Sequence, residues 1–283
     1  MMVRFPFALP FIVALVVIVI LVVVILRLRP KGHSAAGPEE KSWEATTPHH
    51  VFSGGPSIAT GYEDLDGMLG GGIPEEFAVL ILSQSYDERD LLIRKAIESN
   101  VSRGKLTFYM SADISKTQDL ARSFPRNFYA LNPMADKMGQ GFENVTKIPD
   151  VGNLSDLNIS SNEFLDAHTD VGKGNLLIID LVTDILLRNK AVTTRKWLSE
   201  FIAKRKTAHF TIMATLDPAV ASKEDTEATV GVFDGIIEIF ERELQERSRR
   251  FLVVKKMYGH DYSDEELMLD RQKLLGRTGA HGD

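Results

Sequence analysis

The chain contains no cysteine among its 283 residues, so disulfide bonds, thiolate zinc sites and cysteine nucleophiles are all excluded. It also lacks an excess of basic residues, because 33 Lys and Arg stand against 39 Asp and Glu and the formal net charge is -6. Affinity for nucleic acid comes mainly from clustered Lys and Arg. We therefore expect no nucleic-acid partner.

Charge is also missing from one long stretch near the N-terminus. Residues 5–26 contain no charged side chain and consist mostly of Val, Ile and Leu. A helix of this length spans about 33 Å, enough to cross a hydrocarbon core about 30 Å thick. A cleaved signal peptide would have a shorter apolar region followed by small residues, and a buried soluble helix is rarely apolar on every face. We predict one uncleaved transmembrane anchor within residues 1–29.

The basic residues beside this span predict its orientation. Arg27, Arg29 and Lys31 follow it, whereas Arg4 alone precedes it. Because basic flanks stay on the cytoplasmic side, we expect a single-pass membrane protein whose C-terminal part is cytoplasmic. Four Asn-x-Ser/Thr tripeptides would be N-glycosylation acceptors on the outside, but Asn and Ser are equally typical of turns. These tripeptides begin at Asn100, Asn144, Asn153 and Asn158.

The remainder of the chain divides by composition into a linker, a domain and a tail. Residues 30–56 are rich in Pro, Gly, Ser and Thr and are expected to form a flexible linker. Between residues 57 and 270, short apolar runs alternate with helix-like segments, which predicts an α/β fold with a mainly parallel sheet flanked by helices. Residues 271–283 are expected to be a polar, frayed tail.

Two parts of this domain depart from the simple alternation of strand and helix. The last two predicted strands, residues 235–240 and 250–255, are joined by a charged segment and are expected to form an antiparallel hairpin at the sheet edge. Residues 136–175 show weak periodicity and are predicted to be rich in loops.

The start of the domain carries the most specific pattern in the sequence. Thr60-Gly61, Leu65-Asp66 and the run Leu69-Gly70-Gly71-Gly72-Ile73-Pro74 resemble the segment before the phosphate loop in RecA-superfamily ATPases of the KaiC type, in their archaeal form. The resemblance covers about residues 57 to 260. It implies a RecA-like P-loop NTPase fold, in which a strand and then GxxxxGK[ST] follow.

Glycine is absent where that phosphate loop would fall. The aligned residues are Ser83, Gln84, Ser85, Tyr86, Asp87, Glu88, Arg89 and Asp90. Both loop glycines are replaced, by Ser83 and Glu88, the lysine by Arg89, and the magnesium-binding hydroxyl by Asp90. Backbone N–H groups converge on a phosphate in a curl that glycine tolerates and other residues resist, and three carboxylates would repel a triphosphate. We predict a vestigial nucleotide loop, followed by a helix that starts at Leu91.

The resemblance places other catalytic positions on residues that differ from the family. Residues 176–180 match the strand that delivers a carboxylate to magnesium, so Asp180 is a vestigial metal ligand, or otherwise a helix-capping or loop residue. A pair of glutamates that activates water falls on Asp113 and Ile114, which leaves Asp113 as a vestigial base. In the KaiC-type family, one segment reaches the nucleotide of a neighbouring subunit. The matching segment here retains the lysine as Lys256 but has Tyr258 where the family has an arginine.

Together these patterns predict a membrane-anchored KaiC-like domain that is catalytically inactive and holds no cofactor. Because function resides in sites rather than in folds, we expect it to act by protein-protein interaction in signalling or regulation, with itself as a homo-oligomer or with active KaiC-like relatives. The alternative is a divergent ATP-binding protein or ATPase that uses Mg-ATP, with Arg89 replacing the lysine and Asp113 as base. A recombinase-like DNA-binding relative is disfavoured by the acidic charge and the anchor.

Overall fold

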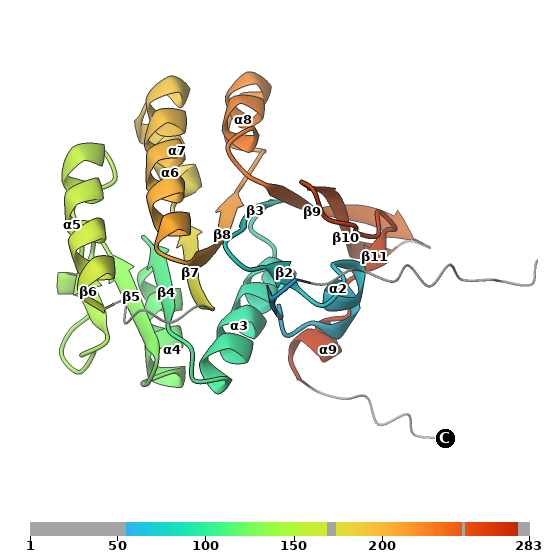
Figure 1. Cartoon of the computed structure of the whole chain (residues 1–283), viewed down its shortest axis with the longest axis horizontal. Helices are drawn as coiled ribbons and strands as arrows, with labels where there is room; N and C mark the ends of the chain where they lie inside the picture. The colour runs from blue at the N-terminus through green and yellow to red at the C-terminus, as the bar shows by residue number, and fades with distance from the viewer. Residues whose placement is uncertain (1–54, 169–173, 245–246, 277–283) are drawn as a thin grey trace, which may run out of the picture. The chain divides into compact units, whose positions relative to one another are not determined.

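The computed structural model describes residues 55–168, 174–244 and 247–276 (Figure 1). Contacts divide the chain into residues 1–49 and 50–283, and all described residues belong to the second unit. The predicted anchor at residues 5–26 and nearly all of the predicted linker therefore lie outside the described residues. Within the described part of the chain, no helix combines the length and apolarity that a bilayer crossing requires.

A nine-stranded sheet with the order β11-β10-β9-β3-β8-β7-β4-β5-β6 forms the centre of this unit. In this order, all neighbouring strands from β9 through β3, β8, β7, β4 and β5 to β6 pair in parallel, which confirms the predicted α/β fold. The strands are β3 (Ala78–Ser83), β4 (Thr107–Ser111), β5 (Phe128–Asn132), β6 (Val145–Lys147), β7 (Asn175–Asp180), β8 (Phe210–Leu216), β9 (Gly235–Leu244), β10 (Arg247–Met257) and β11 (Leu267–Met268). The predicted antiparallel hairpin is β9–β10, and β11 adds a short outermost strand.

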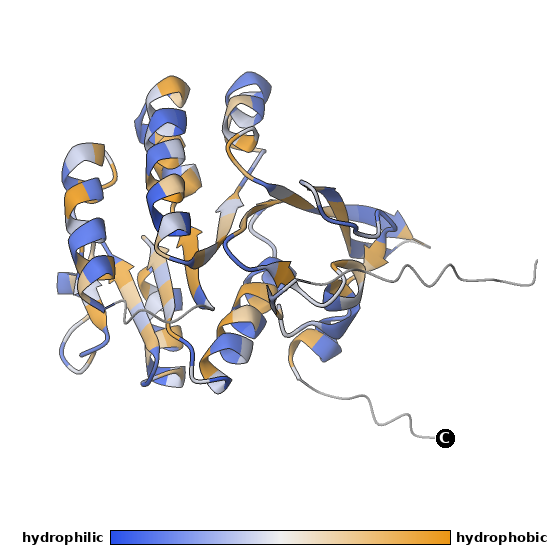
Figure 2. Cartoon of the chain, in the orientation of Figure 1, coloured by the Kyte–Doolittle hydropathy of each residue, from blue (hydrophilic) through white to orange (hydrophobic). Residues whose placement is uncertain are grey.

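Helices cover both faces of the sheet. Successive strand residues point to opposite faces, so a strand that is apolar throughout must be covered on both sides. In β3, Val79 and Ile81 pack in one core cluster and Ala78 and Leu80 in the other. Figure 2 shows the apolar residues concentrated in the strands and on the inward sides of the helices. The helices are α2 (Glu63–Met68), α3 (Asp87–Ser102), α4 (Ile114–Ser123), α5 (Leu154–His168), α6 (Val182–Arg188), α7 (Ala191–Thr207), α8 (Lys223–Val230) and α9 (Arg271–Leu274), with a 3₁₀ turn η1 (Ala135–Lys137).

Two predicted segments differ from the structure. Residues 136–175 contain helix α5, whose buried side includes Ser161 and Asn162 as well as leucines, and these polar residues weaken the apolar periodicity. The predicted frayed tail begins instead with α9. The Asp270 side chain caps that helix, and Leu274 is only 2% exposed in the core.

The glycine-rich start of the domain is held by one carboxylate. Asp66 in α2 accepts hydrogen bonds from the Thr60 backbone N–H at 2.7 Å and from the Thr60 hydroxyl at 2.8 Å. The strands β1 (Ser57–Ile58) and β2 (Ile73–Pro74) then pair as a separate small sheet. Burial raises the pKa of Asp66 above its ordinary value, although the hydrogen bonds from Thr60 oppose this shift.

The raised pKa of Asp66 predicts a pH-dependent contribution to stability. A carboxyl with a raised folded-state pKa favours folding most below its unfolded pKa, and this contribution is lost as pH rises through the folded pKa. We expect the Asp66→Asn variant, which keeps an acceptor for Thr60, to gain stability relative to wild type as pH rises from about 4 to 7. Urea unfolding midpoints at several pH values measure this difference. A difference that stays constant over this range would contradict the prediction.

Candidate functional site

The connection between β3 and α3 falls within residues 83–90, where the vestigial nucleotide loop is predicted. Ser83 ends the strand and Asp87 begins the helix, so only Gln84, Ser85 and Tyr86 lie between them. The buried Ser83 hydroxyl donates to the Gln84 carbonyl at 2.7 Å, and the Tyr86 N–H donates to the same carbonyl at 2.8 Å. The loop is therefore three residues long and closed by its own hydrogen bonds.

The expected helix start at Leu91 is wrong by four residues, since α3 begins at Asp87. The first turn carries Asp87, Glu88 and Asp90. Negative side chains stabilise the positive end of a helix dipole, which is why this acidic segment is helical. The residues that would repel a phosphate thus act at the helix terminus where a phosphate would otherwise bind.

Arg89, the predicted replacement of the phosphate-loop lysine, is directed into the protein and is only 5% exposed. Its guanidinium donates twice to one carboxylate oxygen of Asp90, from Nε at 3.1 Å and from Nη2 at 2.9 Å. Although burial opposes the positive charge, the carboxylates of Asp180 and Asp90 hold the pKa of Arg89 above its ordinary value. Arg89 is therefore a buried cation whose charge is balanced from within the chain.

Asp180 ends β7, at the edge of the sheet where the neighbouring parallel strands also end. One carboxylate oxygen accepts from the Tyr109 hydroxyl on β4 at 2.8 Å, and the other accepts from the Thr215 hydroxyl on β8. Burial and the nearby Asp180 charge raise the pKa of Tyr109 well above its ordinary value, so this phenol remains a donor. The alternative role of helix cap is not observed, because the N-cap of α6 is Leu181 and has no side-chain bond.

Asp113, the predicted vestigial base, is the N-cap of α4. Its side chain accepts from the Lys116 backbone N–H at 2.9 Å. The Lys116 ammonium lies 4.0 Å from Asp113 but 2.8 Å from Asp90, so it links this cap to the acidic turn of α3. The structure gives Asp113 a capping role.

Lys256 and Tyr258 lie at the end of β10. The Lys256 ammonium donates to the Phe233 carbonyl of its own chain at 2.8 Å, whereas Tyr258 is 75% exposed. Arg250, earlier in β10, places its guanidinium over the Tyr86 ring, 4.2 Å from the centroid. The hairpin β9–β10 therefore contacts the loop after β3 directly.

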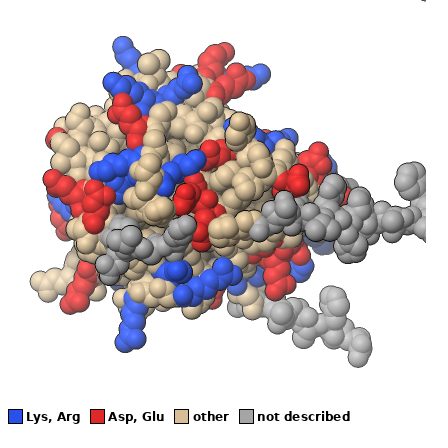
Figure 3. Space-filling view, viewed as in Figure 1, with Lys and Arg blue, Asp and Glu red and all other residues tan. Residues whose placement is uncertain are grey.

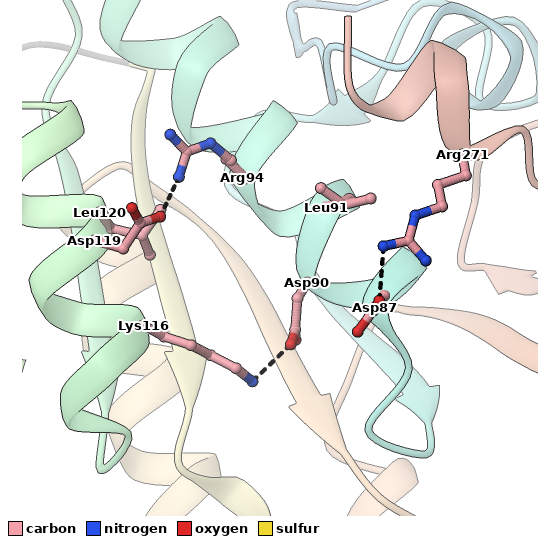
Figure 4. A pocket seen from close by; sticks show the side chains of 8 residues that line it. All are labelled: Asp87, Asp90, Leu91, Arg94, Lys116, Asp119, Leu120 and Arg271. Atoms are coloured by element: carbon pink, nitrogen blue, oxygen red, sulfur yellow. Dashed lines mark hydrogen bonds and ion pairs between the residues drawn. The ribbon is translucent and has the colours of Figure 1, made fainter.

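A pocket of about 220 Å³ lies beside the first turns of α3, where α4 and α9 approach it (Figure 4). Three cations reach it, and each is paired with an acid: Lys116 with Asp90 at 2.8 Å, Arg94 with Asp119 at 2.6 Å, and Arg271 with Asp87 at 2.9 Å. Leu91 and Leu120 complete the lining. With its charges matched one to one, this pocket offers no surplus positive charge to an anion.

Arg89 and Asp180, both candidates for the vestigial nucleotide site, interact electrostatically, and residues that the sequence did not single out contact Asp180 and Asp113. Lys116 bridges Asp90 and Asp113, and the Tyr109 and Thr215 hydroxyls donate to Asp180. The cross-strand partners of Asp180 depend on the strand order, which places β4 and β8 on either side of β7. Among the described residues, no group of three or more His, Asp or Glu side chains is arranged to hold a metal ion.

Comparisons with known proteins agree with this geometry at the level of the fold. No family model matches the chain, and no curated protein matches it. Among solved structures, the chain is similar to a KaiC-like protein from the hyperthermophilic archaeon Pyrococcus horikoshii, with a TM-score of 0.60 and 16% identity. The match covers 76% of this chain and 95% of that one. The described domain therefore has a KaiC/RecA-like fold.

Proposed function

We propose that this chain, whose domain has a KaiC/RecA-like fold, is a membrane-anchored and catalytically inactive relative of these ATPases that acts by protein-protein interaction in signalling or regulation. The proposal depends mainly on the buried position of Arg89 and its pairing with Asp90. A phosphate-loop cation serves by meeting phosphate oxygens, whereas Arg89 is buried against Asp90 and beside Asp180.

The residues present do not fit Mg-ATP. The three-residue loop after β3 contains no glycine, so it cannot curl its N–H groups around a phosphate. Both oxygens of Asp180 already accept hydrogen bonds from protein hydroxyls. A nucleotide would have to displace several internal ion pairs before gaining any of its own.

A role in binding proteins agrees with the surface of the domain better than a role in binding nucleic acid. On the face drawn in Figure 3, Lys and Arg are interspersed with Asp and Glu. Such a mixed surface lacks the continuous basic stripe that follows a phosphate backbone. Candidate partners are a second copy of the chain or an active KaiC-like relative.

Thermal unfolding of the full-length chain in detergent tests the loss of nucleotide binding. We expect no rise in Tm with saturating Mg-ATP, because no site stabilises the triphosphate. A ligand at 100 times its Kd would add about 2.7 kcal/mol, or roughly 5–10 °C for a domain of this size. An ATPase with an intact GxxxxGK[ST] loop, measured in the same buffer, is the positive control.

Asp180→Asn is the matched variant for this experiment. A wild-type shift of several degrees that disappears in Asp180→Asn would contradict the proposal and establish a nucleotide site at β7. Turnover of ATP abolished by the same substitution would establish the alternative, a divergent ATPase.

A further inference from the structure

The hairpin β9–β10 extends beyond the rest of the sheet. β3 pairs with β9 only as far as Ile239, and β11 pairs with β10 only at Phe251 and Leu252. Residues 240–244 and 247–250 therefore form a two-stranded ribbon that has no further strand beside it in the described parts of the chain. The hairpin lies at the end of the sheet opposite to β6 and α5 (Figure 1).

The register of the two strands assigns each residue of the ribbon to one of two faces. Directly opposed residues share a face, and faces alternate along each strand. The inner face includes Glu241 opposite Arg250, and Arg250 contacts the Tyr86 ring below it. The outer face consists of the opposed pairs Phe240 and Phe251, Arg242 and Arg249, and Leu244 and Arg247.

The outer face is cationic and only partly neutralised. Arg242 lies over the Phe240 and Phe251 rings and is bound in two-pronged fashion by Glu266, at 2.6 and 2.8 Å. Arg249 stands directly opposite Arg242, an arrangement of like charges that destabilises a strand pair.

No ion pair of Arg247 or Arg249 is formed within the ranges that the structure describes. Leu244, beside Arg247, is 43% exposed. Two guanidinium groups that form no ion pair with any described residue, and an exposed leucine, thus share one face at the far end of the ribbon. An anionic partner would relieve the repulsion between Arg242 and Arg249.

We propose that the outer face of this ribbon docks the domain onto an anionic phospholipid surface. The inference rests on the proposed membrane anchor, because the linker predicted for residues 30–56 would have a reach of roughly 30 Å and would keep the domain close to the bilayer. At such a distance even a weak contact between the domain and the bilayer is occupied, because the linker gives the domain a high effective concentration at the membrane surface. Arginines bind phosphate headgroups in bidentate fashion, and an exposed leucine such as Leu244 is suited to the membrane–water interface.

An acidic protein surface would match the charge but leaves the exposed Leu244 unexplained. The inner face is already turned to the loop after β3, so only the outer face is free to meet a bilayer. Docking by this face would hold the domain in one orientation on the membrane. It would thereby fix which surfaces are presented to a protein partner.

The absence of native cysteine allows the outer face to be labelled at a single site. Met268→Cys on β11, opposite Phe251 on the outer face and 50% exposed, carries an environment-sensitive fluorophore without replacing an arginine, and Glu163→Cys on α5 is the remote control label. The full-length chain is reconstituted into phosphatidylcholine vesicles with or without phosphatidylglycerol. Blue shift and protection from an aqueous quencher report docking, and flotation reports the anchor.

We expect the label at residue 268, but not the label at residue 163, to be protected only in the vesicles that contain phosphatidylglycerol, and to lose protection at high salt. Arg247→Gln with Arg249→Gln should lower the ratio of docked to undocked domain roughly thirtyfold. Arg126→Gln with Arg195→Gln removes the same charge at exposed positions outside the ribbon and should leave the ratio of docked to undocked domain unchanged.

Equal signals in both kinds of vesicle, or protection that requires an added acidic protein, would overturn the inference. Flotation distinguishes these results from a failure of the proposed anchor. A chain without an anchor would not float with phosphatidylcholine vesicles. An anchored chain without a docking ribbon would float with both kinds of vesicle and show no protection.

Discussion

Replacing Arg89 with methionine is expected to destabilise the domain by about 3–5 kcal/mol, the cost of removing one partner from a buried group of charges. The substitution keeps most of the side-chain volume, so the loss is mainly electrostatic. Asp180 would keep its bonds from Tyr109 and Thr215 but lose the guanidinium charge beside it. Urea unfolding followed by circular dichroism measures the effect.

Two controls distinguish this mechanism from general disruption of α3. Arg94→Met removes a cation from the same helix, but the Arg94 side chain is 37% exposed and its pair with Asp119 should contribute no more than about 1 kcal/mol. Adding Asp180→Asn to Arg89→Met removes the charge left without its partner, and should recover about half of the loss. A loss from Arg89→Met as small as that from Arg94→Met would contradict a buried charge centre.

The Gly72→Ala variant is expected to lose about 4 kcal/mol of stability, against about 2 kcal/mol for Gly71→Ala. Both glycines have positive φ, 122° for Gly71 and 124° for Gly72, so both substitutions incur backbone strain. Only at Gly72 would a methyl group also overlap the Ile58 carbonyl and come within 2.9 Å of the Ala59 Cα. At Gly71 the nearest atom is the Ser57 hydroxyl at 3.6 Å.

The difference between these two glycines tests whether the pairing of β1 with β2 anchors the start of the domain. Ile58 opposes Ile73 in that pairing, so the overlap at Gly72 must separate the two strands. Thermal or urea unfolding of both variants gives the comparison. Equal losses would show that backbone strain alone matters here and that the close approach of Ile58 does not.

Residues 83–90, the predicted vestigial nucleotide loop, begin at the expected end of a strand but contain the start of a helix. Counting from Ile73-Pro74 predicted that the strand ends at Leu82 and that a loop begins at Ser83, and the structure ends β3 at Ser83. The count did not identify Asp87 as the start of α3. A run of acids reads equally well as a solvated loop, and only the backbone decides that it stabilises a helix terminus.

The sequence by itself determined the alternation of strands and helices, the hairpin at the edge and the loss of glycine at the loop, because these features depend on neighbours in the chain. The tertiary structure alone decided the strand order, which brings Tyr109 and Thr215 to either side of Asp180. It also decided that Arg89 is buried against Asp90 and that Arg250 covers Tyr86. These contacts join residues from separate elements, and their energies depend on burial and distance, which no local pattern encodes.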